Sequence, residues 1–279
     1  MKTYFIIFIL LALTNICFSN TIIVDINGAG QFTSINAAIQ AATANDTVKV
    51  WPGTYSEQVT LNKNLTLMGS GYENTIINGS YSPTVSMSSG KLQWLMISSL
   101  AGTGINLSGG IIKNCVVNGC TGSGIATSSG SGQIYNCVIV NNGGSGIIGY
   151  SGGFLTVVNC IVRFNGSTDI NGDGNGNCYY YGSKISLSYS NYGSATCTQG
   201  NQGCITTDPV FSTTTDFHIS QGSPCWDKGN QTLQDPDGSQ SDMGYFGGPD
   251  CPIYPTVFEI HITPSGNTIN LQAKGRANY

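Results

Sequence analysis

Residues that could carry chemistry are few in this sequence, because charged side chains make up only 9% of its 279 residues. Two segments are rich in carboxylates. Asp169 and Asp173 have the spacing that opens an EF-hand calcium loop, but a Tyr stands where that loop needs its Glu. Asp235, Asp237 and Asp242 form a second cluster, in which the carboxylates repel one another unless they are solvated or neutralised. Each segment is a candidate Ca²⁺ site, and turn capping by Asp is the alternative for the second.

Three other side chains are candidates for binding sugar. Arg163 is expected to point outward from a predicted strand, where it could pair with a uronate carboxylate and serve as a catalytic residue. Lys113 and Tyr135 are predicted to lie one repeat apart on the outer surface, as a polar and aromatic strip. Ordinary solvated surface is the alternative for all three. The repeats themselves offer no stack of outward acids, because Asp169 is the first acid after Glu73.

These positions are set by a repeat that runs from residue 110 to residue 165. The pattern apolar-x-Asn-Cys-x-apolar occurs three times, with its cysteines at steps of 22 and 23 residues. Apolar residues alternate over short runs between Gly, Asn and Ser, which is typical of strands and turns. Three short strands with their turns fit about 22 residues at ~3.3 Å per strand residue. The sequence therefore predicts an all-β fold, a right-handed parallel β-helix with a short N-terminal capping helix.

The repeat also predicts what lies inside each coil. The apolar positions should stack, and so should the three cysteines, as small buried residues. The aligned asparagines should lie where each coil bends, and each amide is expected to bond the asparagine one coil away. Asn142 is expected in a solvated turn. The aligned residues are Cys115, Cys137 and Cys160, and Asn114, Asn136 and Asn159.

Two further segments carry a family resemblance. Residues 34–42 predict a helix that starts at Thr33 or Ser34, and strand patterns follow at residues 46–55 and 64–71. This opening resembles that of the pectin-lyase-like superfamily of right-handed β-helix proteins. Residues 208–249 are similar to the closing segment of secreted, mostly bacterial, β-helix-repeat proteins. The resemblance implies the fold more strongly than any activity.

Enzymes of that superfamily imply specific constellations. Lyases typically use calcium carboxylates with an Arg or Lys base, methylesterases use paired Asp with Gln and Arg, and polygalacturonases use several Asp with His and Arg. Because the sequence shows none of these sets, the favoured prediction is a non-catalytic protein that binds extracellular carbohydrate or a cell-surface glycan. The alternative is a polysaccharide lyase or related carbohydrate-active enzyme acting on uronate-containing glycans.

The remaining expectations concern organisation and location. Residues 1–19 read as a signal peptide, 20–251 as the β-helix domain, and 252–279 as a strand pair that could begin an incomplete β-sandwich. A secreted monomer with no transmembrane segment is predicted. The net charge of -4 argues against nucleic acid as a partner. Export favours disulfides, and the expected pairs are Cys197–Cys204 and Cys225–Cys251.

Overall fold

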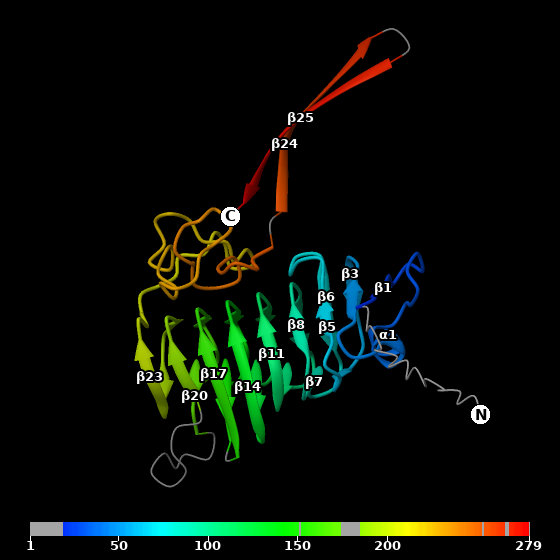
Figure 1. Cartoon of the computed structure of the whole chain (residues 1–279). Coiled ribbons are helices and arrows are strands. Elements are labelled where there is room, and N and C mark those ends of the chain that lie inside the picture. The colour runs from blue at the N-terminus through cyan, green and yellow to red at the C-terminus, as the bar shows by residue number, and fades with distance from the viewer. Residues whose placement is uncertain (1–18, 151, 174–184, 253, 266–267, 279) are drawn as a thin grey trace, which may run out of the picture.

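The chain folds into stacked coils, each built from three short parallel strands. The computed structural model describes residues 19–150, 152–173, 185–252, 254–265 and 268–278 (Figure 1). The strands stack into three parallel sheets, called sheets A, B and C here, so the fold is the predicted right-handed parallel β-helix. Sheet A holds β1 (Thr21–Val24), β2 (Thr47–Val50), β5 (Thr66–Met68), β8 (Lys91–Gln93), β11 (Gly109–Lys113), β14 (Gly130–Tyr135), β17 (Gly153–Val158), β20 (Ile185–Ser188) and β23 (Thr198–Gln202).

The other two sheets complete the coils. Sheet B holds β3 (Gly53–Tyr55), β6 (Thr75–Gly79), β9 (Met96–Ser99), β12 (Val116–Asn118), β15 (Val138–Val140), β18 (Ile161–Arg163) and β21 (Asn191–Tyr192). Sheet C holds β4 (Val59–Leu61), β7 (Val85–Met87), β10 (Ile105–Leu107), β13 (Ile125–Thr127), β16 (Ile147–Gly149), β19 (Ile170–Asn171) and β22 (Ala195–Thr196). Outside the coils, β24 (Tyr254–Ser265) and β25 (Thr268–Asn278) form an antiparallel pair, as the alternation of residues predicts.

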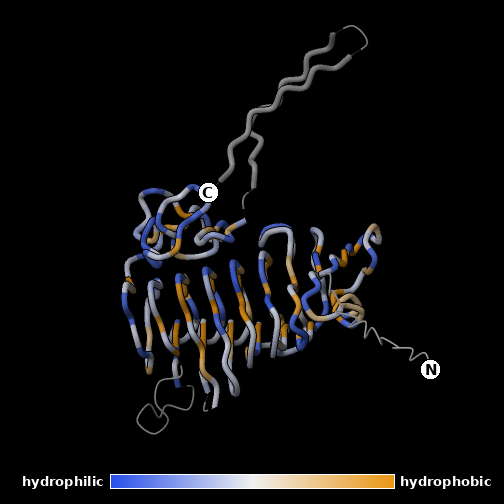
Figure 2. Tube along the Cα trace, in the orientation of Figure 1, coloured by the Kyte–Doolittle hydropathy of each residue, from blue (hydrophilic) through white to orange (hydrophobic). Residues whose placement is uncertain are grey.

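The interior of the coils confirms the predicted register. Ile112 pairs with Ile134, which pairs with Val157, so equivalent apolar residues stack from coil to coil. The cysteines at positions 115, 137 and 160 are fully buried. Burial raises the pKa of the Cys115 thiol to about 12, so it stays protonated as a small core residue. Figure 2 shows hydrophobic residues recurring in coil after coil along the stack.

Helix α1 (Ile35–Ala41) covers the N-terminal end of the stack, as predicted. Ser34 is its N-cap and accepts a hydrogen bond from the Ala37 N–H. The carboxylate of Glu57 accepts the N–H groups of Ile35 and Asn36, at 2.7 and 3.1 Å. The first turn of the helix is thus satisfied by an acid from the next coil.

Residues 206–252, called the closing segment here, lie against the outer face of sheet B (Figure 1). Apolar outward residues of β12, β15 and β18 are buried beneath this segment in a second hydrophobic core, separate from the one inside the coils. This core explains why β12 and β15 carry consecutive apolar residues, since both faces of these strands are covered. Its buried members are Val116, Val138, Val140 and Ile161 from sheet B, Tyr72, and Phe217, Cys225, Met243, Tyr245 and Phe246 from the closing segment.

The predicted asparagine ladder is wrong in its bonding. The three residues, called the asparagine row, do lie buried at the bends with left-handed backbone angles of 46°, 48° and 55°. However, their amides hold the closing segment rather than one another. Asn114 Nδ2 donates to the carbonyls of Tyr245 and Gly247, at 2.7 and 2.8 Å. Asn136 donates to the Asp242 carbonyl, and Asn159 accepts from the Asn230 N–H. The backbone carbonyls of the closing segment that are buried at these bends need hydrogen-bond donors, and the amides of Asn114 and Asn136 supply them.

A ladder of asparagines does exist, at a different bend. Asn142 Nδ2 donates to Asn165 Oδ1 at 2.9 Å, and Asn142 Oδ1 accepts the Cys120 N–H at 3.0 Å. Asn142 is only 1% exposed, so its expected place in a solvated turn is wrong. The turn closes over the coil interior, and the amide replaces water as the partner of buried backbone groups.

Both predicted disulfides are wrong. Cys204, Cys225 and Cys251 are free thiols. Cys197 is disulfide-bonded, but Cys204 is not its partner. Cys225 is instead part of the second core, where burial raises its pKa to about 12. The predicted signal peptide lies almost entirely outside the described residues, and no described helix is long and apolar enough to cross a membrane.

Candidate functional site

Arg163 lies where the sequence predicts, in register with Val140 and Asn118 on the outer face of sheet B. Its guanidinium is engaged there. Nη1 donates to the Thr206 carbonyl at 2.9 Å, and the guanidinium carbon lies 5.4 Å from the centre of the Phe164 ring. Arg163 therefore holds the start of the closing segment through this hydrogen bond. Its role as a catalytic or uronate-binding residue stays a prediction.

Lys113 and Tyr135 are neighbours in sheet A, as predicted. Lys113 forms an ion pair with Asp250 of the closing segment, and the Tyr135 hydroxyl donates to Gln133 Oε1 at 3.1 Å. Lys113 and Tyr135 thus lie side by side as the predicted strip, but the charge of Lys113 is paired with that of Asp250.

The carboxylates predicted to bind Ca²⁺ do not form one group. Both oxygens of Asp169 accept hydrogen bonds: Oδ1 from the Asn165 N–H and amide, and Oδ2 from the N–H groups of Gly193 and Ser194. Asp173 is buried, and the residues that follow it in the EF-hand-like stretch lie outside the described part of the chain. Asp169 thus acts as a turn cap, and Ca²⁺ binding by this stretch stays a prediction.

Asp235 and Asp242 are a buried pair in the closing segment. Burial raises the pKa of Asp235 to about 6 and that of Asp242 to about 7, although hydrogen bonds from backbone N–H groups lower both pKa values in part. Asp235 Oδ2 accepts the Asp242 N–H at 2.9 Å, and Asp242 Oδ1 accepts the Asp227 N–H at 2.7 Å. Asp237 is exposed and caps Ser239. At 7% and 3% exposure, the pair is out of reach of a polymer substrate. Calcium binding by this loop stays a prediction.

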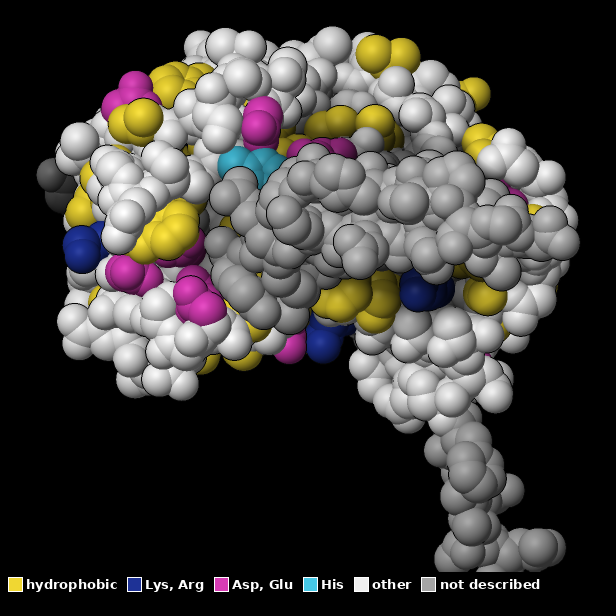
Figure 3. Space-filling view, turned by 90° about the horizontal axis from the view of Figure 1, so that it is seen from above, with side chains coloured by type: hydrophobic (Ala, Val, Ile, Leu, Met, Phe, Trp, Pro, Cys, Tyr) yellow, Lys and Arg dark blue, Asp and Glu magenta, His cyan; other side chains and the backbone are white. Residues whose placement is uncertain are grey.

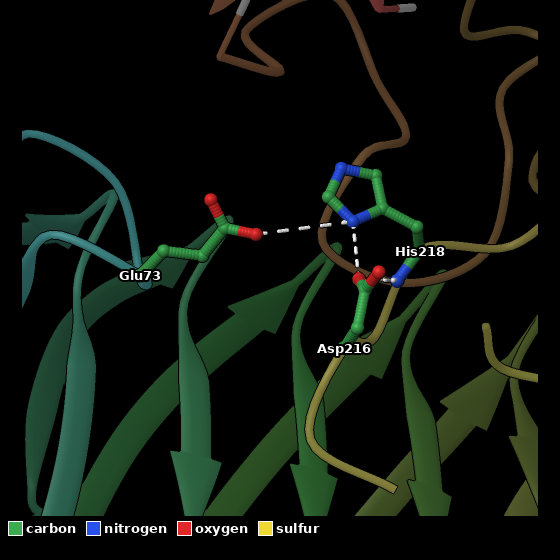
Figure 4. A group of neighbouring side chains, drawn as sticks. All are labelled: Glu73, Asp216 and His218. Carbon is green, nitrogen blue, oxygen red and sulfur yellow. Dashed lines mark hydrogen bonds and ion pairs between the residues drawn. The ribbon is translucent and has the colours of Figure 1, made fainter. Parts of the chain in front are cut away.

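Sequence reasoning missed the group that the structure does bring together. Glu73, Asp216 and His218, called the acid–histidine group, each offer a ligand atom within 4.8 Å of the others (Figure 4). Glu73 comes from the turn between β5 and β6, and the other two come from the closing segment. The spacing Asp216-x-His218 was a signal, because alternate residues of an extended chain share a face. Nothing in the sequence pointed to Glu73, which only the fold brings near.

The imidazole of His218 is held on two sides. Its ring stacks on Phe246, with centroids 4.0 Å apart and an angle of 25° between the planes. Nδ1 makes a short hydrogen bond to Asp216 Oδ1 and lies 3.9 Å from Glu73 Oε1. Asp216 Oδ1 also accepts the His218 N–H at 3.1 Å, and the Tyr72 hydroxyl lies 3.4 Å from it. Figure 3 shows the histidine at the surface, with acidic side chains beside it.

The contacts fix which nitrogen carries the proton. Burial raises the pKa of Asp216, but the hydrogen bonds that it accepts from His218, with the charge of His218 when the ring is protonated, hold the pKa below its usual value. When the ring is neutral, the ionised carboxylate can still only accept, so Nδ1 carries the N–H group. The lone pair is then on Nε2, which points away from both carboxylates (Figure 4). This is the arrangement of a general base held by an acid.

A pocket of about 490 Å³ is lined by Phe217, which stands between Asp216 and His218 in the chain, whereas the three residues of the group do not line it. The turn from Thr213 to Phe217 contributes to its wall, and Asp216 is in the same turn. Its lining is mostly apolar, as in binding sites for small groups. Phe164 and Val210 are about half exposed and have positive φ angles of 58° and 55°. Val210 is β-branched, so this backbone is strained and is maintained by its surroundings, including the Val210 N–H bond to Asp208.

The family model described as Pectinesterase matches residues 21–118, which is less than half of the chain. Among curated proteins, none matches. Two similar solved structures are the deglycosylated pectin methylesterase from Aspergillus niger and the pectin methylesterase PemA from Erwinia chrysanthemi. The first is 16% identical, with a TM-score of 0.45, covering 68% of this chain and 84% of that chain. The second is 13% identical, with a TM-score of 0.38, covering 62% and 70%.

The chain has the pectin-lyase-like parallel β-helix fold. The Pectinesterase match corrects the favoured functional prediction, because it points to a carbohydrate esterase rather than a non-catalytic binder. The alternative, a polysaccharide lyase, is not supported either. The coils carry no stack of outward acids, and two of the three residues in the acid–histidine group come from the closing segment, which is distant in sequence from Glu73.

Proposed function

We propose that this protein is a carbohydrate esterase that hydrolyses ester groups on a uronate-containing polysaccharide such as pectin. The observation that carries the proposal is the Pectinesterase match over residues 21–118, a stretch that includes Glu73 of the acid–histidine group. The geometry adds a base of the right kind, since the Nε2 lone pair of His218 faces outward and its other nitrogen is held by Asp216. The mostly apolar pocket that Phe217 lines would receive part of the substrate.

In the proposed reaction, His218 Nε2 removes a proton from a water molecule as the water oxygen attacks the ester carbonyl carbon. The imidazolium that forms is stabilised by the carboxylate of Asp216. When the tetrahedral intermediate collapses, the bond from carbon to the alcohol oxygen breaks, and the imidazolium returns its proton to that oxygen. The products are the free carboxylic acid, which ionises, and the alcohol. His218 is the catalytic residue in this scheme, and Asp216 is a positioning residue.

The proposal also places the protein outside the cell as a monomer. Its support is the signal-peptide pattern of residues 1–19 and the extracellular location of pectin-like polymers. Detection of the mature chain in the culture medium, with its mass measured by light scattering, tests both points.

The central test is hydrolysis of methyl-esterified and acetylated pectins, followed by the alcohol or acetate released. General base catalysis contributes about 10²–10⁴-fold, so His218→Gln should lose at least ~100-fold in kcat. Asp216→Asn should lower kcat with little change in KM, because the amide can present its N–H group to Nδ1 and then favours the wrong tautomer.

The chain offers a matched control for Asp216 outside the proposed substrate pocket. Asp237 also accepts the N–H group two residues onward, from Ser239 at 2.9 Å, just as Asp216 accepts from His218. Asp237→Asn changes the same type of turn without touching the base or the pocket. Equal losses from Asp237→Asn and Asp216→Asn would refute a role for the pair in catalysis, and an inactive wild-type chain on all ester substrates would refute the esterase itself.

A further inference from the structure

We propose that the acid–histidine group is a binding site for a divalent transition metal ion of the Zn²⁺ type, and that the bound ion switches off the proposed base. The ligand atoms are one imidazole nitrogen and two carboxylate oxygens, all within 4.8 Å of one another. No other cluster of three such residues exists within the described part of the chain. The carboxylates of the Asp235, Asp237 and Asp242 loop do not converge in this way.

The donor set decides the kind of ion. Imidazole suits Zn²⁺, Cu²⁺ and Ni²⁺, whereas Ca²⁺ and Mg²⁺ prefer oxygen ligands throughout. Zn²⁺ binds nitrogen and carboxylate oxygen at about 2.0–2.2 Å and uses three protein ligands where a fourth position stays open to water. Nδ1 of His218 is already beside Asp216 and 3.9 Å from Glu73, so small side-chain shifts would place all three around one ion.

The ligands are supported by a fixed surrounding. The His218 ring is stacked on Phe246, and the Tyr72 hydroxyl lies within reach of Asp216. Tyr72 is itself anchored, because its N–H donates to the Tyr245 hydroxyl at 3.2 Å. Glu73 is more exposed and approaches from the coils. Support of this kind orients ligands and raises metal affinity. Because the ligands come from the coils and from the closing segment, a bound ion would link the two.

The second half of the proposal rests on the proposed function. The base needs its proton on Nδ1, held by Asp216, and its lone pair on Nε2. A metal ion occupies the Nδ1 lone pair, so the neutral ring must then carry its proton on Nε2. That nitrogen becomes a donor and cannot accept a proton from water. Metal binding and base catalysis at His218 therefore exclude each other.

The test of binding uses the full chain freed of metal with EDTA and titrated with ZnCl₂ by calorimetry, and its thermal melting with and without Zn²⁺. The expected result is one ion per chain and an upward shift of Tm, since a ligand that binds only the folded state stabilises it. Glu73→Gln and His218→Asn should each weaken uptake by more than ~10-fold, the loss that even a changed supporting residue can cause. Both should remove the Tm shift.

Asp237→Asn is the matched control, because it removes an exposed carboxylate of the other acidic cluster. It should leave uptake and the Tm shift unchanged. Three results would overturn the site: no uptake by the wild-type chain, uptake that survives both Glu73→Gln and His218→Asn, or uptake lost in Asp237→Asn.

Inhibition is read separately. Zn²⁺ at saturation should stop ester hydrolysis, and EDTA should restore it. Bound Zn²⁺ that leaves hydrolysis unchanged or raises it would overturn the switch while leaving the site intact. If the chain hydrolyses no ester at all, the proposed function and the switch fall together, but the calorimetric result still decides whether the metal site exists.

Discussion

Replacing Asn114 by Ala should be among the most destabilising single changes in the chain, because this side chain joins the coils to the closing segment. Its Nδ2 atom donates to the Tyr245 and Gly247 carbonyls at 2.7 and 2.8 Å, and the residue is fully buried. Its backbone has a φ of 46°, which Asn tolerates better than Ala.

The magnitude follows from three contributions. Each buried carbonyl that loses its donor costs about 1–3 kcal/mol. Forcing Ala into the left-handed region adds about 1 kcal/mol. Against this, Asn114 Oδ1 is itself buried without a hydrogen-bond partner, so its removal recovers part of the loss. The expected decrease in the free energy of unfolding is about 4 kcal/mol.

Asn141→Ala is the control for the backbone contribution. Asn141 has a similar φ of 54°, but its side chain is exposed and donates only to Asn118 Oδ1, at 3.0 Å. Its replacement should cost about 1 kcal/mol. Urea unfolding followed by tryptophan fluorescence measures both variants, and Trp94 reports on the closing segment because its Nε1 donates to the Asp250 carbonyl at 2.9 Å. If the two variants differ by less than about 0.5 kcal/mol, the asparagine row does not anchor this segment.

Three further outcomes are expected. The pKa values of about 6 for Asp235 and 7 for Asp242 exceed the value of about 3.9 in an unfolded chain, so the folded state binds these protons more tightly. Their stabilising contribution is then full below about pH 4 and declines as pH rises through 6 and 7; urea midpoints at pH 5 and 8 should show the decline, and Asp242→Asn should flatten it. Asn142→Ala should lower the free energy of unfolding by about 1–3 kcal/mol, measured the same way, and a smaller effect would mean that its ladder is replaceable by water. Cys137, fully buried with its pKa raised by burial, should resist alkylation in the native protein, while the partly exposed Cys204 reacts; rapid labelling of Cys137 would contradict the stacking.

The coils could be predicted from the sequence because their information is local. A repeat of the form apolar-x-Asn-Cys fixes the interior positions, and parallel stacking then fixes the register, as the pairing of Ile112 with Ile134 shows. The helix at residues 35–41 could be predicted for the same reason, from its N-cap and its apolar face.

The closing segment could be recognised but not placed. Consecutive apolar residues such as Val116-Val117 and Val138-Ile139 indicate strands that are buried on both faces, and this signal was available. The sequence did not show which part of the chain covers these strands, because the closing segment is distant in sequence and irregular in structure. The bonding of Asn114 and the meeting of Glu73 with His218 both depend on that docking.

That docking is a condition for the acid–histidine group. All strands of the coils precede Asp216 and His218 in the chain. A chain truncated after residue 205 would therefore keep the residues of its solenoid and lack its site. The group is completed only when the closing segment packs on sheet B, so a measurement of metal binding or activity at this group also reports that the segment has docked.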